Sequence, residues 1–269
     1  MKRPLVAIFA GNHGVARHGI SPRSVTATAG TVELCAAGGA EINQVCVAYD
    51  LGLKVFDLAL HVPTGDISEA AALDERGCAA TMAFGMEAIA DGTDLLCLGD
   101  LGVGNSTVAA ALLAALFGGT GADWVGPGSG ANETMIARKA GIVDTALAFH
   151  GDHLKDPLEA LRRVGGREFA AIAGAILAAR MQKIPVLIDG FAAFAAAAVL
   201  HAVNPAALDH CLLASLSPQP AHARAAAKMG FRPLLDLRLD HGEGVGAGLA
   251  AGIVKAAALC SSGMAAAVR

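Results

Sequence analysis

The chain is poor in aromatic and charged residues. Aromatic residues make up 4% and charged residues 16% of its 269 residues, with one Trp and one Tyr. Disordered chains combine low hydrophobicity with high charge, so this composition excludes that class. Lys and Arg (20) do not outnumber Asp and Glu (24), and a net charge of −4 gives no support to nucleic-acid binding. We therefore expect a packed globular protein with no nucleic-acid partner.

Several patterns that identify a function directly are also missing. The chain has no three-residue glycine repeat, no Walker loop with Gly-Lys-Ser/Thr, no Gly-x-Ser-x-Gly elbow and no Cys-x-x-Cys spacing. Its six cysteines lie mostly in apolar runs, which favours free thiols and a cytoplasmic location. His150 and His153 are spaced like metal ligands, but no third ligand lies near them in sequence, so we expect no metal site.

Small and apolar residues are abundant instead. The chain has 60 Ala and 33 Gly, hydrophobic residues make up 54%, and the mean hydropathy is +0.52. The uncharged stretches 101–122 and 190–208 are long enough to span a membrane, but neither has aromatic belts or a flanking Lys/Arg bias. We interpret both as buried helices and expect no membrane partner. The first apolar run, residues 5–10, is too short for the core of a secretory leader.

Short apolar runs alternate with helix-like segments along the whole chain. This alternation predicts an α/β fold with a mostly parallel open sheet flanked by helices, Rossmann-like and three-layered. No linker divides the chain, so we expect one domain over residues 1–269, with a small helical lobe from the C-terminal segment. The predicted strands are 5–10, 54–60, 94–98, 185–189, 211–215 and 234–239. The predicted helices are 25–51, 67–90, 107–117, 133–149, 168–181, 192–203, 221–229 and 246–260.

Polar clusters follow the predicted strands. They occupy residues 11–14, 99–100, 189–190, 217–219 and 240–244. Ligands of open parallel sheets bind beyond the carboxyl ends of the strands, where these clusters would lie. Turn chemistry alone explains Asp189-Gly190 about as well as a site does. It explains Gly242-Glu243-Gly244 less well, because a glutamate between glycines has no turn role, and this makes Glu243 the best catalytic candidate.

Two glycine-rich loops are candidates for anion binding. Residues 100–107 (DLGVGNST) lead into a helix that Ser106 or Thr107 would cap, and residues 126–130 (GPGSG) lead into a helix with Arg138 and Lys139. Such loops let backbone N–H groups approach a phosphate at a helix N-terminus. Glycine alone leaves a sugar-phosphate site and plain tight packing about equally supported. The first loop is a poor dinucleotide fingerprint, because Thr107 stands where the third glycine belongs, so a dehydrogenase is disfavoured.

Taken together, these motifs resemble the nicotinate-nucleotide–dimethylbenzimidazole phosphoribosyltransferase family of cobalamin nucleotide assembly. The resemblance extends from about Val6 to Met264 and rests on several motifs in the same order. These are AGNHGVA (10–16), GGAEIN (38–43), LGDLGVGNST (98–107), ADWVGPGSG (122–130), ARKA (137–140), GGREFAAIAGAILAA (165–179), PVLIDGF (185–191) and GEGVGAGLA (242–250).

The resemblance implies transfer of phosphoribose from nicotinate mononucleotide to 5,6-dimethylbenzimidazole, without a cofactor or metal. The glutamate of the family's GEG motif maps onto Glu243, as the base that removes the incoming N–H proton. Asn12 and His13 would line the benzimidazole side. The implied substrate-binding set also contains Asp100, Gly102, Gly104, Asn105, Gly128, Ser129, Gly130, Lys139, Gly242 and Gly244. The family suggests a homodimer.

The chain departs from the family pattern at several positions. Asp100 stands where the family has glutamate, and Pro127 and Asp240 stand where it has arginines. Each lost charge-assisted contact could weaken anion binding by about 1.5–3 kcal/mol. The segment that family members carry before the first strand is also absent from this sequence. The alternative is therefore a catalytically impaired homologue that acts as a binding or partner subunit, in a hetero-oligomer with a full-length homologue.

Overall fold

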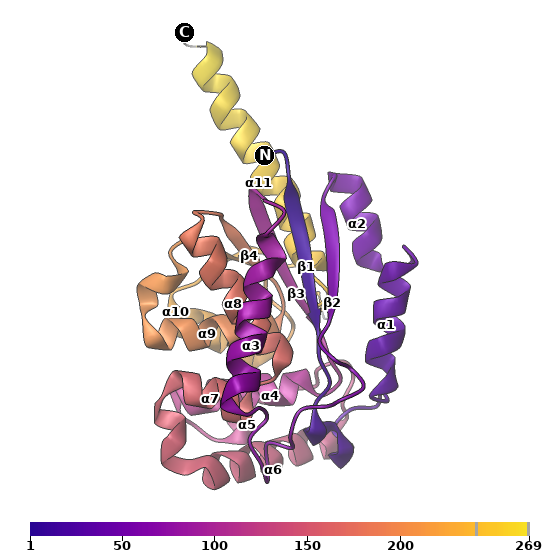
Figure 1. The fold of residues 1–269 in the computed structure, drawn as a ribbon, viewed down its shortest axis with the longest axis vertical. Coiled ribbons are helices and arrows are strands. Elements are labelled where there is room, and N and C mark those ends of the chain that lie inside the picture. The colour runs from indigo at the N-terminus through magenta and orange to yellow at the C-terminus, as the bar shows by residue number, and fades with distance from the viewer. Residues whose placement is uncertain (240–241, 268–269) are drawn as a thin grey trace.

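A parallel β-sheet forms the centre of the molecule (Figure 1). The computed structural model describes residues 1–239 and 242–267, and within them six strands form one sheet in the order β2-β1-β3-β4-β5-β6. All adjacent pairs of these strands are parallel. The strands are β1 (Pro4–Ala10), β2 (Gly52–Asp57), β3 (Leu95–Leu101), β4 (Val186–Ile188), β5 (Cys211–Ser215) and β6 (Pro233–Leu235). The predicted α/β class and parallel sheet are confirmed.

Both faces of the sheet are buried, and β1 illustrates why its sequence is continuously apolar. Ala7 and Phe9 belong to the hydrophobic core on one face, whereas Val6, Ile8 and Ala10 belong to the core on the other. A strand covered on both sides needs apolar residues at every position rather than at alternate ones. The continuous apolar run at residues 5–10 therefore predicted this strand, although apolar and polar residues do not alternate in it.

Helices cover the two faces and make three layers. Helices α1 (Thr26–Ala36), α2 (Glu41–Tyr49) and α11 (Val245–Ala267) pack on one face. On the other face lie α3 (Glu75–Met86), α8 (Arg167–Met181), α9 (Phe191–Val203) and α10 (Pro220–Met229). Figure 1 shows α1 and α2 on the opposite side of the strands from α3. The three-layer arrangement matches the prediction.

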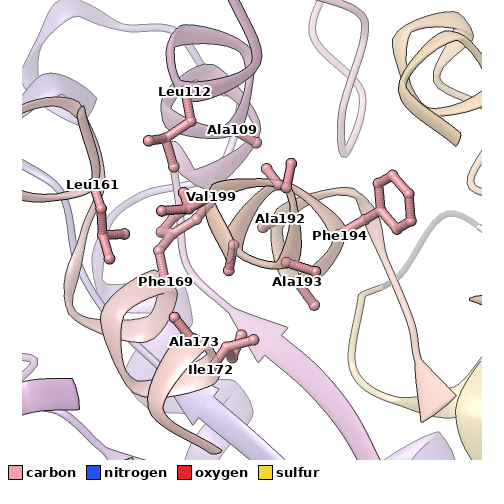
Figure 2. Close-up of a cluster of buried hydrophobic side chains, with 14 of the residues drawn as sticks. Ala109, Leu112, Leu161, Phe169, Ile172, Ala173, Ala192, Ala193, Phe194 and Val199 are labelled. Atoms are coloured by element: carbon pink, nitrogen blue, oxygen red, sulfur yellow. The ribbon is translucent and has the colours of Figure 1, made fainter. Parts of the chain in front are cut away.

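Additional helices lie between β3 and β4, at the carboxyl end of the sheet. They are α4 (Asn105–Phe117), α5 (Gly121–Trp124), α6 (Glu133–His150) and α7 (Pro157–Val164). Alanine, leucine and phenylalanine side chains of α4, α7, α8 and α9 form the core that joins them to the sheet (Figure 2). The predicted helical lobe from the C-terminal segment is wrong in its location, because that segment is the single helix α11 and the extra helices lie here.

Two predicted helices differ from the structure. The segment 25–51 is broken because Gly38 adopts a φ of 79°, and Asn43 then accepts from the Ala40 N–H and donates to the Cys35 carbonyl. The segment 67–90 becomes helical only at Glu75, after Asp74 caps the N-terminus by accepting from the Gly77 N–H. In both cases polar side chains satisfy the backbone groups at a helix end.

Helix α11 projects beyond the rest of the molecule at its C-terminal end (Figure 1). The segment Val245–Met264 is long and apolar enough to cross a membrane by length and composition, and about a third of its most apolar window is buried. Buried helices of soluble proteins also pass that criterion. The stretches 101–122 and 190–208 contain α4 and α9, both of which are largely buried.

Candidate functional site

A cleft opens at the carboxyl ends of the strands, where the sequence places its polar clusters. Its walls come from the loop before α1, the end of β3, the start of α4, the loop before α6 and the starts of α9 and α10. The segment before α11 closes it. The polar residues that line it are Ser21, Arg23, Thr28, Thr31, Asp100, Asn105, Ser106, Ser129, Lys139, Ser217, Gln219 and Glu243.

The N-termini of α4, α9 and α10 open into this cleft. The N-cap of α4 is Gly104, with a φ of 96° and no side-chain cap, and the N-cap of α9 is Gly190, also without one. Gln219 is the N-cap of α10, and its side chain is 4% exposed. The predicted cap residues Ser106 and Thr107 lie inside α4 instead. Helix N-termini carry partial positive charge, so this arrangement favours an anionic ligand.

Lys139 adds a cation to the same side of the cleft. Its side chain is 3% exposed, and its ammonium donates to Ser106 Oγ at 3.3 Å and to the Gly126 carbonyl at 3.1 Å. A Cβ atom on Gly128 would lie 3.2 Å from Lys139 Nζ, so glycine allows the 126–130 loop to approach the amine. Ammonium, hydroxyl and backbone donors together suit a phosphate.

Asp100 forms an acidic centre at the end of β3. Its carboxylate accepts from Asn105 Nδ2 at 2.5 Å and from the Ala193 N–H at 3.2 Å. Burial raises the pKa of this carboxyl well above its usual range, and the negative charge of Glu168 adds to the rise. The surroundings of Asp100 therefore disfavour the ionised form of its carboxyl group.

The glycines around Glu243 allow the backbone of this segment to approach the end of β3 closely. The Asp100 N–H donates to the Gly242 carbonyl at 2.8 Å, and a Cβ atom on Gly99 would lie 2.5 Å from the Gly244 nitrogen. Gly244 itself has a φ of 79°. The segment thus crosses directly over the end of β3 and brings Glu243 to the cleft wall. Asp240 and His241 lie outside the described residues.

The cleft brings together most of the predicted site residues. Those that line it are Asp100, Gly102, Gly104, Asn105, Gly128, Ser129, Lys139, Gly242 and Glu243. Gly130 and Gly244 are neighbours of lining residues. Asn12 and His13 do not line it: Asn12 is 4% exposed and donates to the Leu60 carbonyl, and His13 is 1% exposed and bonded to Glu168. The structure therefore places Asn12 and His13 behind the wall of the cleft.

Sequence reasoning missed Arg23 and gave Gln219 no role. Arg23 lies in the loop before α1 and adds positive charge to the cleft. Gln219 is buried, and its Oε1 has no hydrogen-bond partner among the described residues. Its position after a predicted strand was the feature of the sequence that could have identified it as a site residue.

The Ser217 N–H donates to His222 Nδ1, and burial lowers the pKa of His222 to about 4, so this imidazole is neutral.

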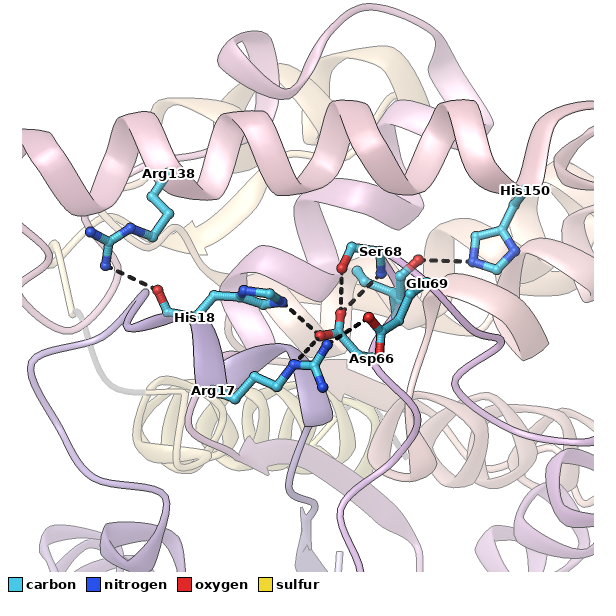
Figure 3. A network of polar contacts seen from close by, with 8 residues as sticks. Arg17, His18, Asp66, Ser68, Glu69, Arg138 and His150 are labelled. Carbon is cyan, nitrogen blue, oxygen red and sulfur yellow. Dashed lines mark hydrogen bonds and ion pairs between the residues drawn. The ribbon is translucent and has the colours of Figure 1, made fainter.

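A polar network holds the segment that leads into the Arg23 loop (Figure 3). Asp66 accepts from Arg17 at 2.8 Å and bonds His18 at 2.6 Å. On the other side, Arg138 of α6 donates to the carbonyls of His18 and Gly19. These contacts fix one wall of the cleft against α6, the helix that carries Lys139.

The described residues show no group of three or more His, Cys, Asp or Glu side chains that could hold a metal ion. His150, considered above as a ligand, is buried and bonded through Nε2 to the Ile67 carbonyl at 3.0 Å. Each of the six cysteines is a free thiol, and Cys260 is exposed.

Comparisons with known proteins identify the family of the chain. A phosphoribosyltransferase family model matches residues 1–268. The nicotinate-nucleotide–dimethylbenzimidazole phosphoribosyltransferase of Rhizobium johnstonii is 66% identical over 265 residues, covering 98% of this chain and 78% of that protein. The Rhizobium meliloti protein of the same name is 65% identical over the same shares. The crystal structure of CobT from Thermus thermophilus superposes with a TM-score of 0.88 at 36% identity, covering 96% of this chain and 83% of that one. The chain belongs to the family of nicotinate-nucleotide–dimethylbenzimidazole phosphoribosyltransferases.

Proposed function

We propose that this chain transfers the phosphoribosyl group of nicotinate mononucleotide to 5,6-dimethylbenzimidazole, giving α-ribazole 5′-phosphate and nicotinate. The observation that carries the proposal is that one cleft holds both kinds of group that the substrate needs. Helix N-termini and the Lys139 ammonium supply donors for a phosphate, and Asp100 and Glu243 supply carboxyl groups. A substrate with a phosphate and a cationic pyridinium ring matches this combination of groups.

The reaction needs one proton acceptor. The bond between C1′ and the pyridinium nitrogen breaks, and its electron pair neutralises the ring, so nicotinate leaves without a general acid. A benzimidazole nitrogen bonds to C1′, and the other ring nitrogen gives up its proton. Glu243 is the acceptor in this proposal, because it lines the cleft beside the buried Asp100. The ribosyl carbon carries positive charge during transfer, which negative charge on the carboxyl groups that line the cleft would stabilise.

Incubation of the purified chain with both substrates tests the proposal. Nicotinate and α-ribazole 5′-phosphate should form in equal amounts, as separated by liquid chromatography. Omission of the benzimidazole should stop nicotinate release. If nicotinate mononucleotide binds to the chain but no nucleotide product forms, the proposed activity is wrong.

Replacement of Lys139 with Gln should raise the KM for nicotinate mononucleotide about 10- to 100-fold, because a charge-assisted contact to phosphate contributes about 1.5–3 kcal/mol. The value of kcat should change much less, since the phosphate does not react. Nicotinate riboside, which lacks the phosphate, should be used equally by the variant and the wild type. Exposed Lys155, which pairs with Asp152, provides the control Lys155→Gln. A similar KM increase for nicotinate riboside would contradict the assignment of Lys139 to the phosphate.

A homodimer in the cytoplasm is the remaining part of the proposal. Large apolar side chains are exposed on α2 and α11, including Val47 (81%), Leu259 (70%) and Met264 (71%). Helices α2 and α11 pack against each other, and exposed apolar surface on neighbouring elements is typical of protein interfaces. If the dimer forms through α11, the wild type should sediment as a dimer and Leu259→Glu as a monomer. A wild-type monomer, or a dimer that Leu259→Glu leaves intact, would contradict this interface.

A further inference from the structure

Behind the wall of the cleft lies a buried pair of ionisable side chains, His13 and Glu168. His13 follows β1, and Glu168 lies in the first turn of α8. Both side chains are 0% exposed, and His13 Nε2 lies 2.5 Å from Glu168 Oε1. His13 Nδ1 and Glu168 Oε2 are buried and have no hydrogen-bond partner among the described residues. Burial of such a pair is weak evidence for stability, because its desolvation is costly.

Glycines make room for the pair on several sides. A Cβ atom on Gly11 would overlap Glu168 Oε2, and one on Gly166 would lie 2.6 Å from His13 Cε1. A Cβ atom on Gly102 would lie 3.2 Å from Glu168 Oε1 and 3.4 Å from His13 Nε2. Since Gly102 also lines the cleft, the pair lies directly behind the backbone at that point.

The charge of Glu168 reaches the reacting region. Asp100 is surrounded by acids from several elements: Glu168 from α8, Asp189 from the end of β4 and Glu243 from the segment before α11. After burial, Glu168 is the largest cause of the raised pKa of Asp100. Near Asp100, α4 contributes the neutral amide of Asn105. His13, from the segment after β1, contacts Glu168. Glu168 is thus coupled to Asp100 without lining the cleft itself.

We propose that His13 and Glu168 form a positioning pair for phosphoribosyl transfer. They support the backbone of Gly102 from behind, and the negative charge of Glu168 acts on Asp100 and on the ribosyl carbon as it becomes cationic. His13 orients the Glu168 carboxyl group through the Nε2–Oε1 contact. This inference rests on the proposed function and goes beyond it, because it assigns a role to residues that do not touch the substrates.

The test compares Glu168→Gln with the wild type. Gln keeps the size of the side chain and a hydrogen bond to His13 but removes the charge. We expect kcat to fall about 10- to 100-fold, with the KM for nicotinate mononucleotide changed less than about threefold. The limb of the kcat–pH profile that reports Asp100 should move to lower pH, because loss of the neighbouring negative charge eases ionisation of Asp100.

His150→Gln is the matched control, because His150 is also a buried, hydrogen-bonded histidine but lies outside the cleft. It should leave kcat and the pH profile unchanged. His13→Gln should reduce kcat, and the double variant with Glu168→Gln should lose less than the product of the two single losses, since the residues act as a unit. Thermal unfolding of each variant shows whether the fold is retained.

The proposed activity and the positioning pair can fail separately. If the wild type forms no product, the proposed function fails. If the wild type is active and folded Glu168→Gln has the same kcat and pH profile as His150→Gln, the positioning pair is wrong. A loss of kcat with an unmoved pH profile would reduce Glu168 to a packing role and would likewise overturn the inference.

Discussion

Replacement of Glu243 with Gln is expected to reduce kcat about 100- to 10,000-fold, the usual contribution of a positioned general base. Gln has nearly the same size as Glu but cannot accept the benzimidazole proton. The Kd for nicotinate mononucleotide should stay within about threefold of the wild-type value, because the phosphate and ribose contacts are assigned to other residues. Product formation and calorimetric binding measure the two quantities.

A base without an N–H proton provides a sharper test of the same role. 1-Methylbenzimidazole can attack C1′ through its unsubstituted nitrogen and gives a cationic product with no proton to lose. Wild type and Glu243→Gln should therefore use it at similar rates, although they differ strongly with dimethylbenzimidazole. A large defect with both bases would show that Glu243 does something other than accept the proton.

Glu87→Gln is the control for the glutamate substitution. Glu87 is exposed and precedes β3, so it lies near the amino ends of the strands, whereas the cleft lies at their carboxyl ends. The kcat of Glu87→Gln should equal that of the wild type. If Glu243→Gln also retained full activity with dimethylbenzimidazole, the proton would have to go to another group, and Asp100→Asn would then be the variant to examine.

The fold could be predicted largely because each strand is a short apolar run. Strands buried on both faces, such as β1, are continuous in apolar residues, and a polar or turn residue ends each one. The break between α1 and α2 was harder to see, because Ala-rich sequence continues on both sides of Gly38-Gly39. It depends on Asn43 satisfying backbone groups of Ala40 and Cys35, a tertiary detail that periodicity does not report.

The site was predictable where a residue follows a predicted strand. Asp100 and Glu243 were found in this way, and both line the cleft, although Asp100 lies within β3 and Glu243 lies well after the end of β6. His13 also follows a strand, but its imidazole turns inward to Glu168, which is distant in sequence. Arg23 lies in a loop whose position depends on packing against α6. Neither the inward orientation of His13 nor the position of Arg23 in the cleft could be predicted from residue spacing, because each depends on which distant segment the loop contacts.

The abundance of Gly and Ala has a measurable consequence where α3 crosses α8. A Cβ atom on Gly85 would overlap the carbonyl oxygen of Ala171, and one on Gly174 would overlap that of Met82. Ala is favoured over Gly within a helix by about 1 kcal/mol, but here the added methyl group must push two buried backbones apart. We expect Gly174→Ala to destabilise the protein by about 2–3 kcal/mol net.

Gly141 in α6 is the matched control, because nothing lies within 4 Å of a Cβ atom at that position. Gly141→Ala should stabilise the protein by up to about 1 kcal/mol, the gain expected from helix propensity alone. At about 2–4 °C of Tm per kcal/mol, thermal unfolding resolves the two opposite shifts. Gly85→Ala combined with Gly174→Ala should cost less than the sum of the single losses, because one separation of the helices relieves both clashes. Equal stabilisation by Gly141→Ala and Gly174→Ala would instead mean that α8, which also carries Glu168, is free to move away from α3 without cost.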